Sequence, residues 1–205
     1  TGFVLLPHRR TDRIKGSPPP VNQEPAPALL TFTSGTTGTP KAIARSHDFL
    51  LGQHEVLKQH MPFTEGDVDL PTLPVFLLHS LAGGATCVIA DADLKEVGKI
   101  DPAPVVNQLK NASITSSSGS PAFFRNIADH LKQTGEKLPA LRDLYMGGAR
   151  VPATLVDDLA SLLPDTAIHI VYGSTEAEPI AVLDGRKHLE ELTEGERSGR
   201  GALVG

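Results

Sequence analysis

The sequence predicts an α/β domain, because short apolar segments alternate with longer stretches of helical periodicity from Ala28 onward. Several of the short segments are rich in β-branched residues, as buried strands usually are. Three of the longer stretches open on a proline, which the first turn of a helix tolerates because that backbone N–H has no helical partner. We therefore expect a layered α/β sandwich.

Five apolar segments are expected to form the strands of this domain. Each is short, and each is separated from the next by polar or helical sequence. They are Ala28–Thr33, Ala85–Ala90, Ser113–Ser117, Leu141–Met146 and Ala167–Tyr172.

Four helices are expected between these strands. The first starts after Ser46, whose hydroxyl can cap a helix. Helical spacing places on one face of it Leu50, His54, Leu57 and Met61. The other three begin at prolines and cover Pro102–Lys110, Pro121–Lys132 and Pro152–Leu163.

The proline-rich start of the chain predicts a connector over residues 1–27, followed by the α/β core over residues 28–205. Five prolines lie within Ser17–Pro27 beside polar residues, which favours an extended chain. Cys87 has no second cysteine to pair with, and its apolar surroundings indicate a buried thiol.

Composition argues against two classes of partner. The formal net charge is −5, so no basic face for nucleic acid is expected. No apolar run approaches the roughly 20 residues that a membrane-spanning helix needs. A cytoplasmic location fits these features.

The most informative segment chemically is Thr33–Lys41, which directly follows an apolar segment. Its small residues let the backbone approach a ligand, its hydroxyls and turn N–H groups can donate hydrogen bonds, and its lysine adds positive charge. These features suit a polyphosphate, although the spacing is not that of a Walker A motif. The alternative is a polar surface loop with a stray lysine. The expected phosphate contacts are Thr33, Ser34, Gly35, Thr36, Thr37, Gly38, Thr39 and Lys41.

The order of these residues, TSGTTGTPK, closely resembles the phosphate loop of the adenylate-forming superfamily of acyl-CoA synthetases, luciferases and peptide-synthetase adenylation domains. Ala42 stands where that family usually has Gly. The resemblance implies the core of the large N-terminal domain of such an enzyme. It also implies that ATP and Mg²⁺ are used to activate a small-molecule substrate, a carboxylic acid expected to be a fatty or β-hydroxy fatty acid, as an acyl adenylate.

A second segment, Tyr172–Glu176, follows the last expected strand. A hydroxyl and a carboxylate at the C-terminal end of a strand can hold Mg²⁺, so Thr175 and Glu176 are the expected metal ligands. The segment resembles the family's second nucleotide motif. The alternative interpretation is an ordinary turn after a strand, with a solvated Glu. The resemblance implies further nucleotide contacts by Tyr172, Gly173 and Ser174. The implied catalytic group comprises Glu176, Thr175 and Lys41.

Two more segments resemble the family in the same order along the chain. Met146–Arg150 resembles the turn that lies against the adenine, which implies contacts by Gly148, Ala149 and Arg150; the alternative is a plain connection between a strand and a helix. Leu73–Gly84 and Ser118–Pro121 resemble the acyl pocket. The implied substrate-pocket residues are Phe76, His79, Ser118 and Gly119, although His79 is equally compatible with a core histidine.

Phrases such as VDLPTLPVFLLHSLAGG and IVYGSTEAEPIAV resemble most the β-lactone synthetases of bacterial olefin biosynthesis. Those enzymes adenylate a β-hydroxy acid, whose own hydroxyl then displaces AMP. The alternatives are an acyl-CoA synthetase, with CoA as a further partner, an acyl-AMP ligase, or a non-catalytic nucleotide-binding module.

Several parts of the family pattern do not appear in the chain, so the core is expected to be incomplete at both ends. The Thr-Gly-Asp segment and the C-terminal lid domain with its lysine would follow Gly205, and the first subdomain would precede Thr1. We expect this chain alone to have little adenylating activity while retaining weak affinity for nucleotide.

Overall fold

The computed structural model describes residues 5–6, 27–33 and 41–203. Within these ranges the central sheet has the strand order β1-β5-β4-β6-β7-β8-β9. Strands β4 to β8 are parallel, and the outer strands β1 and β9 are antiparallel to their neighbours. The strands are β1 (Leu5–Leu6), β4 (Val68–Pro71), β5 (Thr86–Val88), β6 (Ser116–Gly119), β7 (Asp143–Met146), β8 (Ala167–Ser174) and β9 (Ala177–Asp184).

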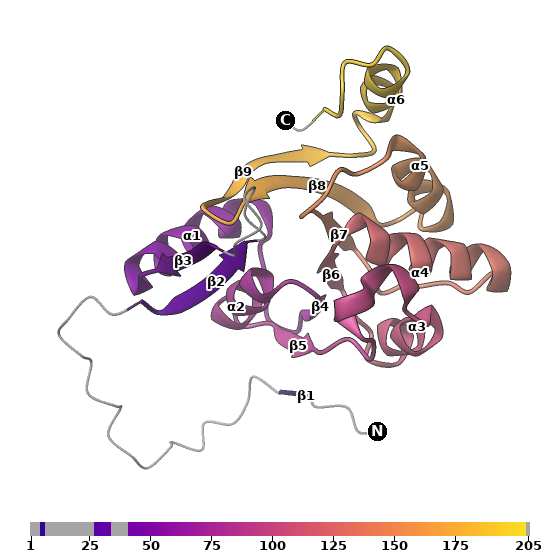
Figure 1. The fold of residues 1–205 in the computed structure, drawn as a ribbon. Helices are drawn as coiled ribbons and strands as arrows, with labels where there is room; N and C mark the ends of the chain where they lie inside the picture. Colours follow the sequence, from indigo (N-terminus) through magenta and orange to yellow (C-terminus); the bar gives the residue numbers. More distant parts are fainter. Residues whose placement is uncertain (1–4, 7–26, 34–40, 204–205) are drawn as a thin grey trace.

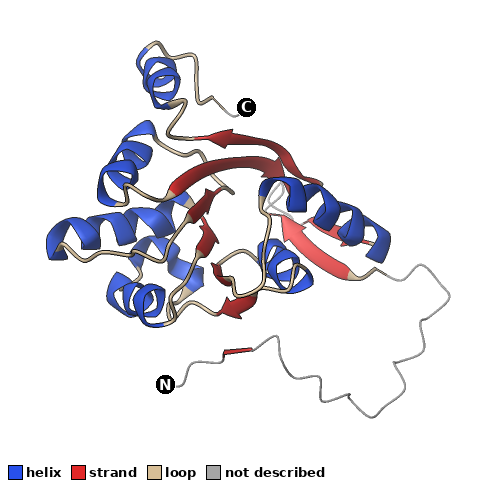
Figure 2. Ribbon diagram, turned by 180° about the vertical axis from the view of Figure 1, so that it is seen from behind, coloured by secondary structure: helices blue, strands red, loops and turns tan. Residues whose placement is uncertain are grey.

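Helices cover both faces of this sheet (Figure 1). One face carries α3 (Pro102–Asn111), α4 (Pro121–Thr134) and α5 (Ala153–Leu162), with a 3₁₀ segment η1 (Leu94–Lys99) against α4. The other face carries α1 (His47–His60) and α2 (Pro74–Ala82). The last helix, α6 (Leu189–Arg197), contacts α5. Figure 2 shows the strands lying between the two groups of helices.

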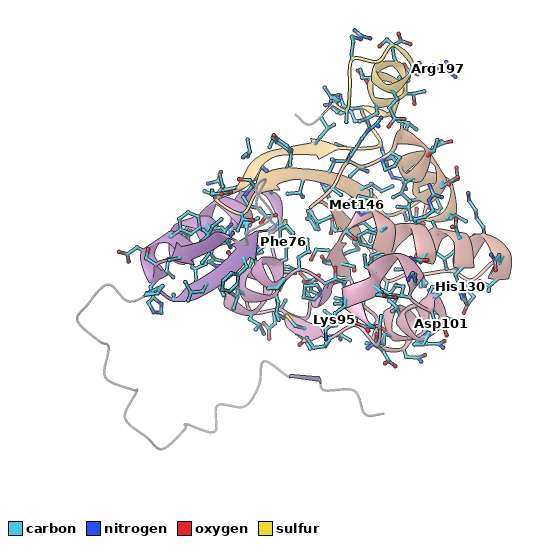
Figure 3. The ribbon with its side chains drawn as sticks, in the orientation of Figure 1. Phe76, Lys95, Asp101, His130, Met146 and Arg197 are labelled. Carbon is cyan, nitrogen blue, oxygen red and sulfur yellow. The ribbon has the colours of Figure 1, made fainter. Side chains whose placement is uncertain are left out.

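The side chains of β7 point alternately to the two faces of the sheet, and each face has its own hydrophobic core. Leu144 and Met146 belong to the larger core under α3, α4 and α5, whereas Tyr145 belongs to the smaller core with Phe76 of α2 (Figure 3). Successive side chains of a strand point to opposite faces, so a strand buried on both sides supplies both cores. This arrangement confirms the predicted layered α/β sandwich.

A second, two-stranded sheet precedes α1. It is the antiparallel pair β2 (Leu29–Thr33) and β3 (Lys41–Arg45), which lies beside α1 in both ribbon views (Figures 1 and 2). Its pairing runs from Leu29 opposite Arg45 to Thr33 opposite Lys41. The two strands are therefore a hairpin whose connecting residues, 34–40, lie outside the described residues.

Most of the predicted elements are present, with shifted ends. The strand expected at Ser113–Ser117 is found at Ser116–Gly119, because Ser113 takes a left-handed φ of +49° at the preceding turn. The helix expected from Pro152 begins at Ala153, with Pro152 as its N-cap residue. The elements that the sequence reasoning missed are β1, β3, β4, β9, α2, α6 and η1.

The connector predicted over residues 1–27 lies mostly outside the described residues. Of its residues only 5–6 and 27 are described, and Leu5–Leu6 pair with β5. Cys87 is buried on β5, as predicted. Throughout the described ranges, no helix has both the length and the apolar character that a membrane crossing requires.

The predicted cap of α1 is confirmed: the Ser46 hydroxyl accepts a hydrogen bond from the Phe49 N–H at 3.1 Å. We expect Ser46→Ala to lower the free energy of unfolding by about 1 kcal/mol, because that N–H loses its partner. Urea unfolding followed by circular dichroism measures the change. Ser46→Asp, which also caps helices well, should restore the stability; equal losses in both variants would contradict the capping role.

Candidate active site

The carboxyl ends of β7 and β8 open onto a cavity of about 340 Å³. In open α/β sheets, ligands bind outside the carboxyl ends of the strands. The structure brings together here five of the residues predicted to contact nucleotide. The lining consists of Gly148, Ala149, Arg150, Val151, Ile170, Val171, Tyr172, Gly173, Ala202 and Leu203.

Two consecutive glycines shape the side of this cavity that follows β7. A Cβ on Gly147 would lie 2.8 Å from the Val171 carbonyl oxygen of β8, so only glycine lets the two strand ends approach this closely. Gly148 has a φ of +77°, in the left-handed region that favours glycine. At Gly148 the turn therefore presents only backbone to the cavity, which lets a flat ligand such as an aromatic base approach closely.

The two larger side chains of the lining differ in how they are held. The ring of Tyr172 is 45% exposed at the end of β8, so one of its faces is available to a ligand. Arg150 is engaged by α6: its Nη2 lies 3.1 Å from Glu196 Oε1, which also accepts from the Ala153 N–H at the start of α5. Arg150 therefore joins the cavity wall to α6.

Thr175 and Glu176 form the turn between β8 and β9. Ser174 pairs with Ala177 across the two strands, and the register shifts between Tyr172 and Ser174. Glu176 is exposed at the tip of this turn, directly beyond the strand that lines the cavity. The predicted metal ligands and the predicted nucleotide contacts Tyr172, Gly173 and Ser174 thus share one strand end.

The predicted phosphate segment is only partly described. Its first and last residues, Thr33 and Lys41, face each other as the closing pair of the β2–β3 hairpin. Lys41 is the first residue of β3 rather than part of the loop. The phosphate contacts expected between them, Ser34, Gly35, Thr36, Thr37, Gly38 and Thr39, lie outside the described residues.

Two side chains join this hairpin and α1 to the turn that carries Glu176. The Arg45 guanidinium, at the end of β3, donates to the Thr175 carbonyl oxygen. The Gln53 Nε2 of α1 donates to the Glu178 carbonyl oxygen at 2.7 Å. Sequence reasoning missed both residues, because their partners are backbone atoms 130 and 125 positions away along the chain.

The donor set of the described residues fits Mg²⁺ bound together with phosphates. No group of three or more His, Cys, Asp or Glu side chains capable of holding a metal occurs within the described ranges. The turn offers one carboxylate, Glu176, beside the hydroxyl of Thr175. Mg²⁺ is typically bound by one or two carboxylates, substrate phosphates and water, so a complete protein cage is not required.

Three of the four residues predicted for the acyl pocket, Phe76, Ser118 and Gly119, lie in closely packed parts of the described structure. Phe76 is fully buried in the smaller core, and Ser118 is fully buried on β6. A Cβ on Gly119 would lie 2.7 Å from Thr72 Oγ1, so this strand end is tightly packed. The substrate role of these residues stays a prediction.

His79 is held in a hydrogen-bonded position between α1 and α2. Its Nε2 lies 3.0 Å from the Met61 carbonyl oxygen and its Nδ1 lies 2.8 Å from His54 Nδ1. Because the carbonyl can only accept, His79 carries its proton on Nε2, and His54 donates to its Nδ1. Burial lowers the pKa of His79, and nearby His54 lowers it further. Both rings line a separate cavity of about 160 Å³ between the two helices.

A family model described as "AMP-binding enzyme" matches residues 5–200. The chain belongs to this family. Its relatives include an olefin β-lactone synthetase of Stenotrophomonas maltophilia, 37% identical over 179 residues, which are 87% of this chain and 32% of the relative. A long-chain-fatty-acid–CoA ligase of Thermus thermophilus is 33% identical over 85% of this chain and 32% of its own length. The chain thus spans about a third of the length of these AMP-binding relatives.

A solved structure shares the fold of this chain. O-succinylbenzoate coenzyme A synthetase of Bacillus subtilis, solved in complex with ATP and magnesium ion, matches with a TM-score of 0.66 and 23% identity over 82% of this chain and 34% of that one. At this identity the likeness concerns the fold alone. The α/β core of this chain therefore shares its fold with that synthetase.

Proposed function

We propose that this chain forms the nucleotide- and metal-binding core of an enzyme that uses ATP to activate a carboxylic acid as an acyl adenylate. The observation that carries the proposal is the cavity at the carboxyl ends of β7 and β8, where Gly148, Ala149 and Tyr172 meet beside the Glu176 turn. Membership of the AMP-binding family supports the same reaction.

In this proposal the cavity holds the adenosine part of ATP. The backbone at Gly148 and Ala149 and the exposed ring of Tyr172 offer flat surfaces on which a base can lie. The β2–β3 hairpin supplies the phosphate contacts, with Lys41 at its closing pair. A lysine ammonium there acts as a point charge against the β- and γ-phosphates.

Attack of a carboxylate on the α-phosphate brings two anions together, so the site must screen charge and align the reacting atoms. Mg²⁺ supplies part of that screening when bound. On this chain, Glu176 and the Thr175 hydroxyl provide oxygen ligands for it, and Lys41 adds a positive charge from the hairpin.

We further propose a β-hydroxy fatty acid as the substrate, followed by closure of a β-lactone. The similarity to olefin β-lactone synthetases supports this branch. The competing branch is thioester formation with CoA, which the similarity to a long-chain-fatty-acid–CoA ligase favours. Both branches share the adenylation step and differ only in the nucleophile that displaces AMP.

Incubating the full-length enzyme that contains this core with ATP, Mg²⁺ and a β-hydroxy fatty acid, with and without CoA, separates the branches. We expect pyrophosphate release and a CoA-independent lactone, both detectable by mass spectrometry. A matched fatty acid without the hydroxyl should give acyl adenylate but no lactone. Formation of an acyl-CoA thioester would overturn the lactone branch, and absence of acyl adenylate from either acid would overturn the adenylation proposal itself.

A further inference from the structure

The turn that carries Glu176 is held from outside its own hairpin by two buried polar side chains. Arg45 is 4% exposed and Gln53 is 8% exposed, although both belong to residue types that usually lie at the surface. Each uses its buried position to donate to a backbone carbonyl of the turn region. The two donors come from different elements, β3 and α1.

The Arg45 hydrogen bond acts on the peptide unit that leads into Glu176. Thr175 C=O and Glu176 N–H belong to the same rigid plane, so a donor held on the carbonyl fixes the orientation of that plane. The N–Cα bond of Glu176 lies in this plane, so its direction is fixed as well. Arg45 is itself immobilised, because its guanidinium lies 5.6 Å from the centre of the Phe49 ring.

The Gln53 hydrogen bond acts on the other side of the turn. It binds the Glu178 carbonyl oxygen, two residues beyond Glu176, where β9 leaves the turn. β9 is the outer strand of the described sheet and contacts α1. With one carbonyl held before Glu176 and one held after it, the backbone of the turn has little freedom to rotate the carboxylate away.

Arg45 also links this turn to the phosphate hairpin. It lies on β3 with Lys41, four residues apart, which is about 13 Å along an extended strand. The hairpin and the Glu176 turn are therefore fixed relative to one another by a charge-assisted hydrogen bond, a stronger contact than one between neutral groups.

We propose that Arg45 and Gln53 are positioning residues that hold Glu176 where it can bind the metal of a metal–nucleotide complex. The inference rests on the proposed function, because it gives Glu176 the metal role. Neither side chain touches the metal in this proposal: both act through the backbone of the turn.

The test measures binding of Mn²⁺·ATP to the chain by calorimetry, supported by electron paramagnetic resonance of the bound Mn²⁺. We expect Arg45→Met to raise the dissociation constant about ten-fold and Gln53→Leu about three-fold, as the loss of a charged and a neutral hydrogen bond respectively would do. Arg45→Lys, which keeps a cationic donor, should recover part of the loss. Arg142→Met is the matched control, because that arginine pairs with Asp67 at the opposite end of the parallel strands.

A double-mutant cycle distinguishes positioning from general loosening of the fold. In the Glu176→Gln background, Arg45→Met should cause no further loss of Mn²⁺·ATP affinity, because the carboxylate it positions is gone. The same ten-fold loss in that background would overturn the inference. So would unchanged affinity in both Arg45→Met and Gln53→Leu. If thermal unfolding shows that Arg45→Met does not fold, the same cycle built from Gln53→Leu and Glu176→Gln tests the inference.

The two proposals fail in different ways. If Glu176→Gln binds Mn²⁺·ATP as tightly as the wild type, the metal role of Glu176 is wrong and the positioning inference falls with it. If Glu176→Gln loses affinity while the Arg45 and Gln53 variants keep it, only the positioning inference is wrong.

Discussion

In the full-length enzyme that contains this core, replacing Glu176 with Gln should lower the rate of acyl-adenylate formation by a factor on the order of 10²–10³, the loss typical of a single electrostatic catalytic group. The amide keeps the size of the side chain but removes the negative charge that attracts Mg²⁺. Because Glu176 is exposed at the tip of a turn in the described structure, its replacement by an amide of the same size should disturb the packing little. Pyrophosphate release measured against Mg²⁺ concentration should show both a lower maximum and a higher half-saturating concentration of metal.

Glu55→Gln provides the control for this experiment. Glu55 is also exposed, and its carboxylate pairs only with Lys58 on the same turn of α1 among the described residues. We expect its replacement to leave the rate and the Mg²⁺ dependence unchanged. A Glu176→Gln variant with normal metal dependence would show that the charge at the β8–β9 turn has no part in the reaction.

The second large effect concerns Asp69, which lies in the interior on β4. Burial raises its pKa to about 6, although the Ser80 and Ser116 hydroxyls and the Leu70 backbone oppose the rise. Ser80 Oγ lies 2.5 Å from Asp69 Oδ2 and 2.7 Å from the Phe76 carbonyl oxygen. A hydroxyl donates only one hydrogen bond, so both contacts are satisfied together when the carboxyl is protonated and donates to Ser80.

The pH dependence follows from the direction of this shift. The ordinary pKa of 3.8 applies to the unfolded chain, and the folded value is about 6, so the folded state binds more protons between these values. The free energy of unfolding therefore falls as pH rises from 4 to 6 and then levels off. A shift of this size corresponds to about 3 kcal/mol.

Urea unfolding of the wild type and of Asp69→Asn between pH 4 and 7.5 tests this expectation. The neutral amide cannot ionise. The free energy of unfolding of the variant should therefore increase relative to that of the wild type by about 3 kcal/mol as pH rises from 4 to 7. Three other titratable groups interact electrostatically with Asp69. Asp67 raises the pKa of Asp69, whereas Cys87 and Tyr145 stay protonated throughout this range. A difference between the two proteins that does not change with pH would contradict a buried, titrating Asp69.

Local signals in the sequence were sufficient for the elements whose ends are set by neighbouring residues. Ser46 and the prolines at 102 and 121 predicted helix starts correctly, because a cap and a first-turn proline act within one turn. The cavity-lining residues Gly148 and Gly173 were predicted on other grounds, because their segments resemble the family's nucleotide motifs.

The elements that sequence reasoning missed depend on partners far along the chain. β4 contains the buried Asp69 and ends at Pro71, so it does not read as an apolar strand. β3 alternates small and larger residues after Lys41, and the pairing with β2 decides its conformation. Arg45 and Gln53 gave no signal at all, since a hydrogen bond to a distant carbonyl has no residue pattern.

The central claim is that one metal-bound nucleoside triphosphate contacts both the hairpin closed by Thr33 and Lys41 and the turn at Glu176. Nuclear magnetic resonance of the isotopically labelled chain with Mn²⁺·ATP tests it most directly, because the paramagnetic ion broadens the signals of nearby amides. We predict the strongest broadening at residues 33–41 and at Thr175 and Glu176, with little effect on α6. Broadening that appears on α6 and spares the Glu176 turn would contradict the account.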